Sequence, residues 1–275
     1  MKTVFFDLDG TITDSAPGIL ASVRYALEKY HLATNLTDTP THCTGTPTHC
    51  TASDLTSPTS AASPTHCTAS DLTSPTSVAS DTSLNFFIGP PLIDSFQKYL
   101  ACSHSDALQC LAWYRQFYTG ASDVQPSTFN LQPSHLPGML MNSVYPGVVE
   151  TLVRLRESGV KIVLATAKPE VYARQILEHF DLAKYFDFIH GATLDEGRNK
   201  KAQVIAWALT HSGDVGDVVM VGDRADDILG AKSNDIPAIG ALWGYGSEEE
   251  LRTAGASVFA ETINEVFKLI QGGNT

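Results

Sequence analysis

The sequence has 275 residues, of which 43% are hydrophobic, and its formal net charge at pH 7 is −12. This length suits one large domain or a core with a smaller second domain, and the apolar fraction is enough for a buried core. The acidic balance argues against nucleic acid and against an anionic membrane surface as partners, because both would be repelled. No signal sequence and no apolar run long enough to span a bilayer is recognised, so we expect a cytoplasmic protein, a monomer or a weak dimer.

The first predicted element is a short buried strand that starts at Val4 and ends in the string DLDGT at residues 7–11. Alternate side chains of a strand lie on one face, so Asp7 and Asp9 are expected to project to the same side. Two carboxylates this close repel each other unless one is protonated or a cation lies between them, and Gly10 allows the backbone to turn. An Asp-Gly turn with a coincidental second acid would look the same. The functional interpretation is a carboxylate nucleophile, a second carboxylate for proton transfer and a divalent metal, which together transfer phosphoryl groups.

The pattern between this strand and residue 144 is helical. Apolar positions at helical spacing predict three helices, over about 15–30, 92–101 and 106–118. Asp14 or Ser15 is a suitable N-cap for the first of them. Because these helices follow the first strand, we expect residues 15–144 to form a helical cap over the carboxyl ends of the strands.

Two stretches of the predicted cap have the composition of unfolded chain. Residues 39–81 and 121–137 are rich in Ser, Thr and Pro, and the string PTHCTASDLTSPTS occurs unchanged at 47–60 and at 64–77. Apolar residues are too few there to offset the entropy of ordering the chain. The first stretch also contains three His-Cys pairs, which are possible zinc ligands, but their irregular spacing without a Cys-x-x-Cys motif favours a solvated repeat.

From about residue 145 to the end, short apolar runs alternate with helical patterns. Strands are predicted at 160–165, 186–190, 218–222, 238–241 and 257–259. Helices are predicted at 147–157, 170–179, 201–211, 226–233 and 261–270. Together with the first strand, this alternation predicts an α/β fold, with a Rossmann-like parallel sheet covered by helices on both faces. The core is therefore expected to comprise residues 1–14 and 145–275.

The carboxyl ends of the predicted strands carry further chemistry, and ligands of an open parallel sheet bind at these ends. The strand from residue 160 leads into Thr166, whose hydroxyl, with the following backbone N–H groups at a helix start, can bind phosphate oxygens. Two lysines, Lys200 and Lys201, lie at the start of the helix predicted at 201–211. A lysine there can neutralise charge growing on a phosphoryl group. Asp223 follows another strand and offers hard oxygen ligands to Mg²⁺. Each feature alone also suits a helix cap or a solvated charge, but their joint order favours a phosphoryl-transfer site.

Four motifs in this order, namely DLDGT, Thr166, a lysine and GDRADD at 222–227, resemble those of the haloacid dehalogenase superfamily of phosphohydrolases. Four further strings are similar to its phosphoglycolate phosphatase and 5′-nucleotidase-like members: IGPPL at 88–92, TAKP at 166–169, KKAQVI at 200–205 and LWGYGSEEEL at 242–251. The resemblance implies an α/β core with a small helical cap, Mg²⁺ as the cofactor and a small phosphorylated metabolite as the substrate. It implies a phosphatase that acts through an aspartyl-phosphate intermediate.

The same resemblance implies catalytic roles for individual residues. Asp7 is the expected nucleophile and Asp9 the expected acid/base. The catalytic lysine is expected at Lys201, with Lys200 as the alternative. The residues expected to bind the substrate phosphate are Thr166, Ala167 and Lys201.

The metal site is assigned by resemblance as well. The expected ligands of Mg²⁺ are Asp7, Asp9 through its backbone carbonyl, and Asp223. The family pattern G-D-x-x-x-D selects Asp227 rather than Asp226 as the acid that supports the lysine and the waters of the metal.

Other functions remain open. A sugar phosphomutase shares the core motifs and would isomerise its substrate instead of releasing phosphate. A non-catalytic binding or regulatory protein would use the repeat as a docking segment, although the intact acids and lysine argue against it. A dehalogenase is disfavoured by Asp9, because dehalogenation needs no acid for an oxygen leaving group.

Overall fold

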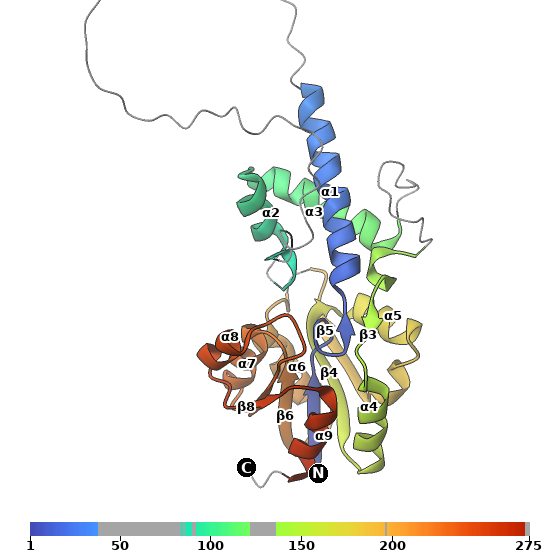
Figure 1. The fold of residues 1–275 in the computed structure, drawn as a ribbon, viewed down its shortest axis with the longest axis vertical. Helices are drawn as coiled ribbons and strands as arrows, with labels where there is room; N and C mark the ends of the chain where they lie inside the picture. The colour runs from blue at the N-terminus through green and yellow to red at the C-terminus, as the bar shows by residue number, and fades with distance from the viewer. Residues whose placement is uncertain (38–83, 85, 90–91, 122–135, 196, 273–275) are drawn as a thin grey trace, which may run out of the picture.

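The computed structural model describes residues 1–37, 84, 86–89, 92–121, 136–195 and 197–272. The repeats within 39–81, their His-Cys pairs and most of 121–137 lie outside these residues, so the predictions made for them stay predictions. The described residues form an α/β core with a group of helices standing at one end of its sheet (Figure 1).

Six parallel strands form the sheet, in the order β5-β4-β1-β6-β7-β8. Their bounds are β1 Lys2–Phe6, β4 Lys161–Pro169, β5 Phe188–Ala192, β6 Asp217–Gly222, β7 Ala238–Ala241 and β8 Val258–Ala260. The central strand β1 is apolar along almost its whole length, as expected for a parallel strand that is buried on both faces. The predicted α/β fold with a parallel sheet is confirmed.

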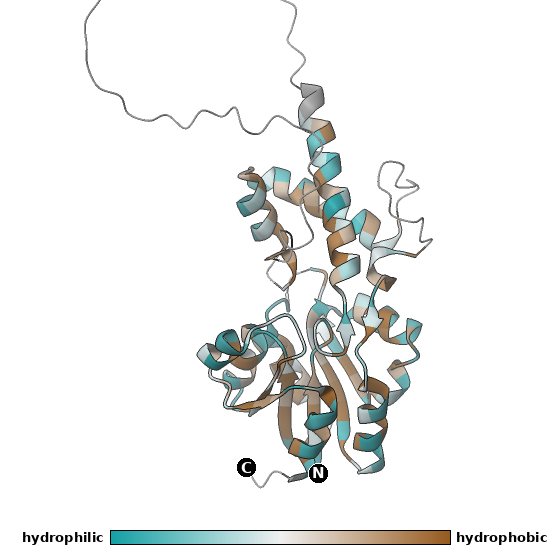
Figure 2. Cartoon of the chain, in the orientation of Figure 1, coloured by the Kyte–Doolittle hydropathy of each residue, from teal (hydrophilic) through white to brown (hydrophobic). Residues whose placement is uncertain are grey.

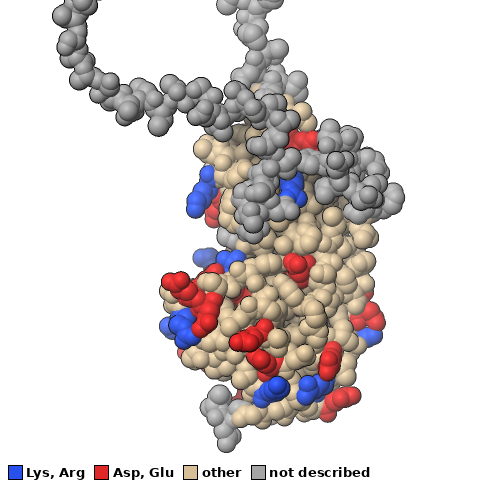
Figure 3. All heavy atoms as spheres, in the orientation of Figure 1, with Lys and Arg blue, Asp and Glu red and all other residues tan. Residues whose placement is uncertain are grey.

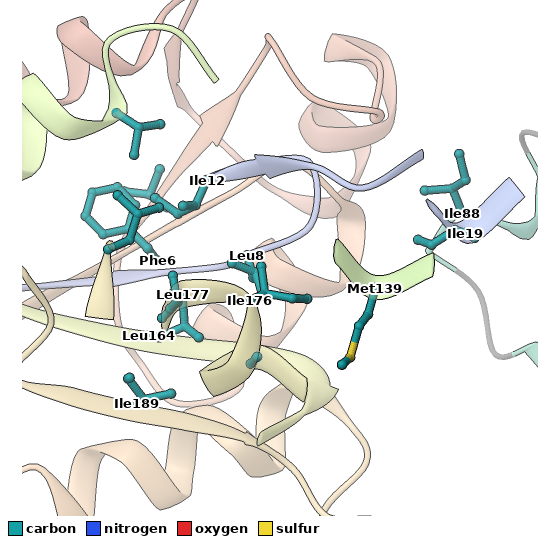
Figure 4. Packing of buried hydrophobic residues seen from close by; sticks show 14 of the residues in the cluster. Phe6, Leu8, Ile12, Ile19, Ile88, Met139, Leu164, Ile176, Leu177 and Ile189 are labelled. Carbon is teal, nitrogen blue, oxygen red and sulfur yellow. The ribbon is translucent and has the colours of Figure 1, made fainter. Parts of the chain in front are cut away.

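Helices cover both faces of this sheet. Their bounds are α4 Val148–Glu157, α5 Glu170–His179, α6 Lys201–His211, α7 Ala225–Lys232, α8 Glu248–Ala254 and α9 Ile263–Gly272. Phe5 packs with residues of α6 and α7 on one face, whereas Val4 and Phe6 pack with residues of α4, α5 and α9 on the other. Figure 4 shows part of the second cluster, and Figure 2 shows that the strands are apolar while the outer sides of the helices are polar. Helix α8 begins within the string LWGYGSEEEL and was not predicted as a helix.

The helices inserted after β1 form the cap. They are α1 Ala16–Thr37, α2 Leu92–Leu100 and α3 His104–Thr119, and α3 packs against both of the others. Helix α1 continues well beyond residue 30, where the sequence pattern predicted its end. Ser103 caps α3 through a capping box with Asp106, which explains why this helix begins slightly earlier than predicted.

The two connections between core and cap lie side by side. Strand β2 (Thr13–Asp14) leads into the cap and β3 (Ser143–Val144) leads out of it, and the two strands pair antiparallel. The chain therefore passes between core and cap through one narrow two-stranded ribbon. Acidic side chains are spread over the core on the face drawn in Figure 3, in keeping with the net charge of −12.

Candidate active site

The turn after β1 places its acids at the carboxyl end of the sheet. The amide of Asp7 donates to the carbonyl of Val221 at 3.0 Å, so Asp7 continues the ladder between β1 and β6. Leu8 between the two acids is fully buried, as the alternation of a strand predicts. Gly10 has φ +84°, and a Cβ atom there would lie 2.2 Å from a carboxylate oxygen of Asp223. Only glycine therefore fits the turn, for its conformation and for its contact with Asp223.

Three buried carboxylates meet at this point. Oxygen atoms of Asp7, Asp223 and Asp227 all lie within 4.8 Å of one another. Asp223 is fully buried and accepts hydrogen bonds from the Thr11 hydroxyl (3.1 Å) and from the backbone N–H of Tyr245 (2.8 Å). Burial raises the pKa of Asp223, and the charges of Asp227 and Asp7 raise it further. A divalent cation would relieve this repulsion, and a set of hard carboxylate oxygens suits Mg²⁺.

Lys201, at the first position of α6, lies against this cluster. Its ammonium nitrogen is 2.5 Å from Asp7 and 2.6 Å from Asp227, and it donates to the carbonyl of Ala165 at 3.2 Å. Burial lowers the pKa of Lys201, but the charges of Asp227 and Asp7 outweigh burial and raise it. Lys200 is exposed on the preceding turn. Of the two candidate lysines, the structure brings Lys201 to Asp7.

The carboxyl end of β4 differs from its prediction. Thr166 is buried, and Ala167 is exposed next to it. The strand was predicted to end at residue 165, but β4 continues to Pro169, so Thr166 lies within the strand and not at a helix start. The helix predicted at 170–179 is confirmed as α5. The residue before a proline avoids the helical region, which keeps this segment extended. The Thr166 hydroxyl accepts the backbone N–H of Lys168 at 3.2 Å instead of capping a helix.

Asp9 is not a member of the carboxylate cluster. One of its oxygens, Oδ2, lies 2.7 Å from the ammonium of Lys168, which is itself only 9% exposed. The other oxygen, Oδ1, is buried without a hydrogen-bond partner among the described residues. The third side chain of the cluster is Asp227, 1% exposed, whereas its neighbour Asp226 is exposed.

The loop at 243–246 also borders the site, although its sequence is more often typical of a loop that only packs. Gly244 and Gly246 pass so close to Asp223 that a Cβ atom on either would lie 2.3 Å or less from it. The indole of Trp243 donates to the carbonyl of Thr11 at 3.0 Å. This loop therefore holds Asp223 and the turn after β1 together.

Tyr245 connects this loop to the start of the cap. Its hydroxyl accepts the backbone N–H groups of Ser15 (2.7 Å) and Ala16 (2.9 Å) and donates to Asp14 at 2.8 Å. Since the backbone N–H of Tyr245 binds Asp223, a single residue contacts both the carboxylate cluster and the first turn of α1. In the sequence, the alternation of aromatic residues and glycines at 243–246 was the only signal for the contacts of Tyr245.

The comparisons with known proteins agree with this geometry. A model of the haloacid dehalogenase-like hydrolase family matches residues 1–235. The chain belongs to this family. The predictions of the family, of its fold and of a hydrolase are confirmed.

Individual relatives of this hydrolase are similar over most of their length. It is 30% identical to a 5′-nucleotidase of Pseudomonas aeruginosa over 250 residues, which cover 90% of this chain and 86% of the relative. It is 30% identical to the tyrosine-protein kinase PtkA of Mycobacterium tuberculosis over 268 residues, which cover 96% and 71% of the two chains. A crystal structure called a predicted phosphatase, from Clostridium acetobutylicum, matches with a TM-score of 0.72 at 33% identity and covers 99% of both chains.

No helix within the described part of this hydrolase is long and apolar enough to cross a membrane.

Proposed function

We propose that this protein is a Mg²⁺-dependent phosphatase that hydrolyses a small phosphomonoester through an aspartyl-phosphate intermediate. The observation that carries the proposal is the buried cluster of Asp7, Asp223 and Asp227, with the ammonium of Lys201 2.5 Å from Asp7. Nucleophile, metal ligands and cation are the components that phosphoryl transfer requires.

In the first half of the proposed reaction, Asp7 attacks phosphorus and the bond to the leaving oxygen breaks. Asp9 protonates that oxygen, for which its unpartnered Oδ1 is available. In the second half, Asp9 takes a proton from the water that attacks the phosphorus of phospho-Asp7. Asp7 is released as a carboxylate and phosphate leaves.

The negative charge of the transferring phosphoryl group has to be neutralised. Mg²⁺, bound by Asp7, Asp223 and the backbone carbonyl of Asp9, would supply positive charge beside the nucleophile. Lys201 adds a cation that Asp227 holds in place at 2.6 Å. Thr166 and the backbone of Ala167 lie at the end of β4, and we assign them to the remaining phosphate oxygens.

The substrate is proposed to be a small phosphorylated metabolite enclosed by the cap, which we take to be residues 15–144. Phosphoglycolate and nucleoside 5′-monophosphates are the first candidates, because of the sequence strings noted above and the 5′-nucleotidase relative. The acidic surface makes a nucleic-acid polymer an unsuitable partner.

The proposal is tested by phosphate release from these two substrate classes and from sugar phosphates, with Mg²⁺ and with a chelator. We expect turnover of at least one class with Mg²⁺ only, and a loss of roughly 10⁴-fold or more in Asp7→Asn, since a missing nucleophile removes most of the rate enhancement. In Asp9→Asn, intact mass spectrometry should find a phosphoryl group that peptide mapping places on Asp7. Phosphate release by Asp7→Asn at the wild-type rate would refute the mechanism.

The same experiment separates the other functions by the acceptor of the phosphoryl group. A sugar phosphomutase returns an isomerised sugar phosphate in place of free phosphate. Addition of ATP and a tyrosine-containing peptide tests for a kinase, the function in the name of one relative, which would transfer phosphate to the peptide. A regulatory protein without catalysis gives no product with any substrate and no phospho-Asp7.

A further inference from the structure

The ammonium of Lys168 joins a core acid to a residue of the cap. It lies 2.7 Å from Oδ2 of Asp9 and donates to the hydroxyl of Tyr118 at 2.6 Å. Lys168 is 9% exposed and Tyr118 is 3% exposed. Lys168 belongs to the end of β4, whereas Tyr118 belongs to the last turn of α3. Lys168 lies in the string TAKP, but the family resemblance assigns it no role, and Tyr118 lies in none of the strings of that resemblance.

Asp9 is held through one oxygen only. Oδ2 is bound to Lys168, and Oδ1 is buried without a partner among the described residues. A carboxylate that must give a proton to a leaving oxygen needs one oxygen anchored and the other free, because proton transfer depends on correct geometry. Lys168 provides this anchor.

The position of Tyr118 depends on the packing of α3. Its ring stacks on Tyr114 with the ring centroids 5.2 Å apart, and it contacts Tyr172 of α5 edge-on at 5.9 Å. Buried lysines need partners for their charge and their hydrogen bonds, and Lys168 finds one partner on each side of the boundary between core and cap. If α3 moved away from the sheet, Lys168 would lose its cap partner and would be free to leave Asp9.

We infer that Lys168 is a positioning residue for Asp9, and that Tyr118 makes this positioning depend on a seated cap. The inference rests on the proposed function, because it concerns the acid/base of that reaction. Its consequence is that efficient protonation of the leaving group is confined to substrates that the cap encloses.

The test compares two leaving groups. p-Nitrophenolate leaves without protonation, whereas the alkoxide of an alkyl phosphate requires it. In Lys168→Met, the single-turnover rate of enzyme phosphorylation should fall by about 10²-fold for the best alkyl substrate, in line with the usual effect of general acid catalysis, and only slightly for p-nitrophenyl phosphate. Lys168→Arg should recover part of the loss, and Tyr118→Phe should give a smaller loss with the same preference.

A second contact between cap and core supplies the control. Arg224 donates to the carbonyl of Ile88 at 2.8 Å and pairs with Glu250 at 2.9 Å, away from the pair of Lys168 and Asp9. Arg224→Gln should raise KM for both substrates and leave their rate ratio unchanged. Two results would overturn the inference. One is that the phosphorylation rate in Lys168→Met falls equally for both substrates; the other is that the rate in Arg224→Gln also falls more for the alkyl phosphate than for p-nitrophenyl phosphate.

Hydrogen exchange adds a readout that needs no turnover. The amides of α3 (104–119) should exchange faster in Lys168→Met and in Tyr118→Phe than in the wild type, and unchanged exchange in both would overturn the role of the cap. If the wild type releases no phosphate from either substrate, the proposed function fails, and the exchange measurement still decides whether Lys168 holds the cap.

Discussion

Gly10 and Asp223 approach so closely that a Cβ atom on Gly10 would lie 2.2 Å from Oδ2 of Asp223. The turn after β1 and the residue after β6 are more than 200 positions apart in the chain, as the 212-residue separation of Thr11 and Asp223 illustrates. The carboxylate cluster therefore exists only while this turn carries no side chain at Gly10.

Gly10→Ala should consequently disrupt the site as well as strain the backbone. A second glycine in the same left-handed region, Gly159 with φ +72°, has no atom within 4 Å of its Cβ position and is the matched control. Gly159→Ala should lose only the strain energy, about 1–2 kcal/mol or roughly 2–8 °C in melting temperature, with full activity. Gly10→Ala should lose more stability and nearly all phosphatase activity. Equal melting temperatures and equal activities of the two variants would contradict this explanation.

The adjacent lysines at the start of α6 should differ sharply in effect. Lys201→Gln removes the cation that lies between Asp7 and Asp227, so we expect kcat to fall by about 10²–10³-fold, as when a charge-stabilising donor is removed elsewhere. Lys200→Gln changes an exposed side chain and should keep kcat within about twofold, because most surface substitutions have small effects. Steady-state kinetics of both variants with one substrate checks the prediction, and a larger effect of Lys200→Gln would reverse the assignment.

The stability of the metal-free protein should depend on the protonation of Asp223. Burial and the neighbouring charges of Asp227 and Asp7 raise the folded-state pKa of Asp223, so the native state binds a proton more tightly than the unfolded state does. The free energy of unfolding of the metal-free protein should therefore decrease as the pH rises above 3.8, the ordinary pKa of this group, until the pH exceeds the raised value. Asp223→Asn should reduce this decrease.

Mg²⁺ should raise the free energy of unfolding of the wild type more than that of Asp223→Asn. Mg²⁺ binds the folded state and should stabilise the wild type by about 2.7 kcal/mol at a concentration 100 times Kd, whereas Asp223→Asn should gain much less. Thermal unfolding in chelator and in Mg²⁺, at several pH values, measures both effects. A wild type that is indifferent to Mg²⁺ would argue against a metal at this cluster.

The repeat in the cap should be dispensable for catalysis. The end of α1, after which the insertion begins, lies at the end of the cap far from the sheet (Figure 1). Long insertions cost little closure entropy, about 0.6 kcal/mol for each doubling of loop length. Deletion of residues 39–81 should thus leave kcat within about twofold of the wild type, measured with the same substrate. A collapse of turnover or of solubility would assign the segment a role in the folded cap.

Local patterns were sufficient for the elements and for the order of the strand ends. The DLDGT string predicted a buried strand followed by a turn, and the alternation after residue 145 predicted the parallel sheet. A parallel sheet gathers the carboxyl ends of its strands at one edge, so Asp7, Asp223 and a lysine of the pair at 200–201 could be expected together before any coordinates. The end of β4 was predicted too early, at residue 165, although the preference of the residue before Pro169 for extended backbone can be read from the sequence.

The choice between equivalent neighbours was made by tertiary structure. Lys200 and Lys201 have the same local chemistry, as do Asp226 and Asp227, and only the direction in which α6 and α7 approach the sheet buries one member of each pair. The family resemblance selected one member of each pair, whereas the local chemistry of the residues did not distinguish the two members.

The sequence by itself determined the class of fold and the kinds of group that its strand ends present, since both follow from periodicity and short spacings. The tertiary structure alone decided which lysine touches Asp7 and that Lys168 joins Asp9 to Tyr118 across the boundary of the cap. The physical reason is distance along the chain: contacts between segments 50 or 194 residues apart depend on how layers pack, and no local pattern encodes that packing.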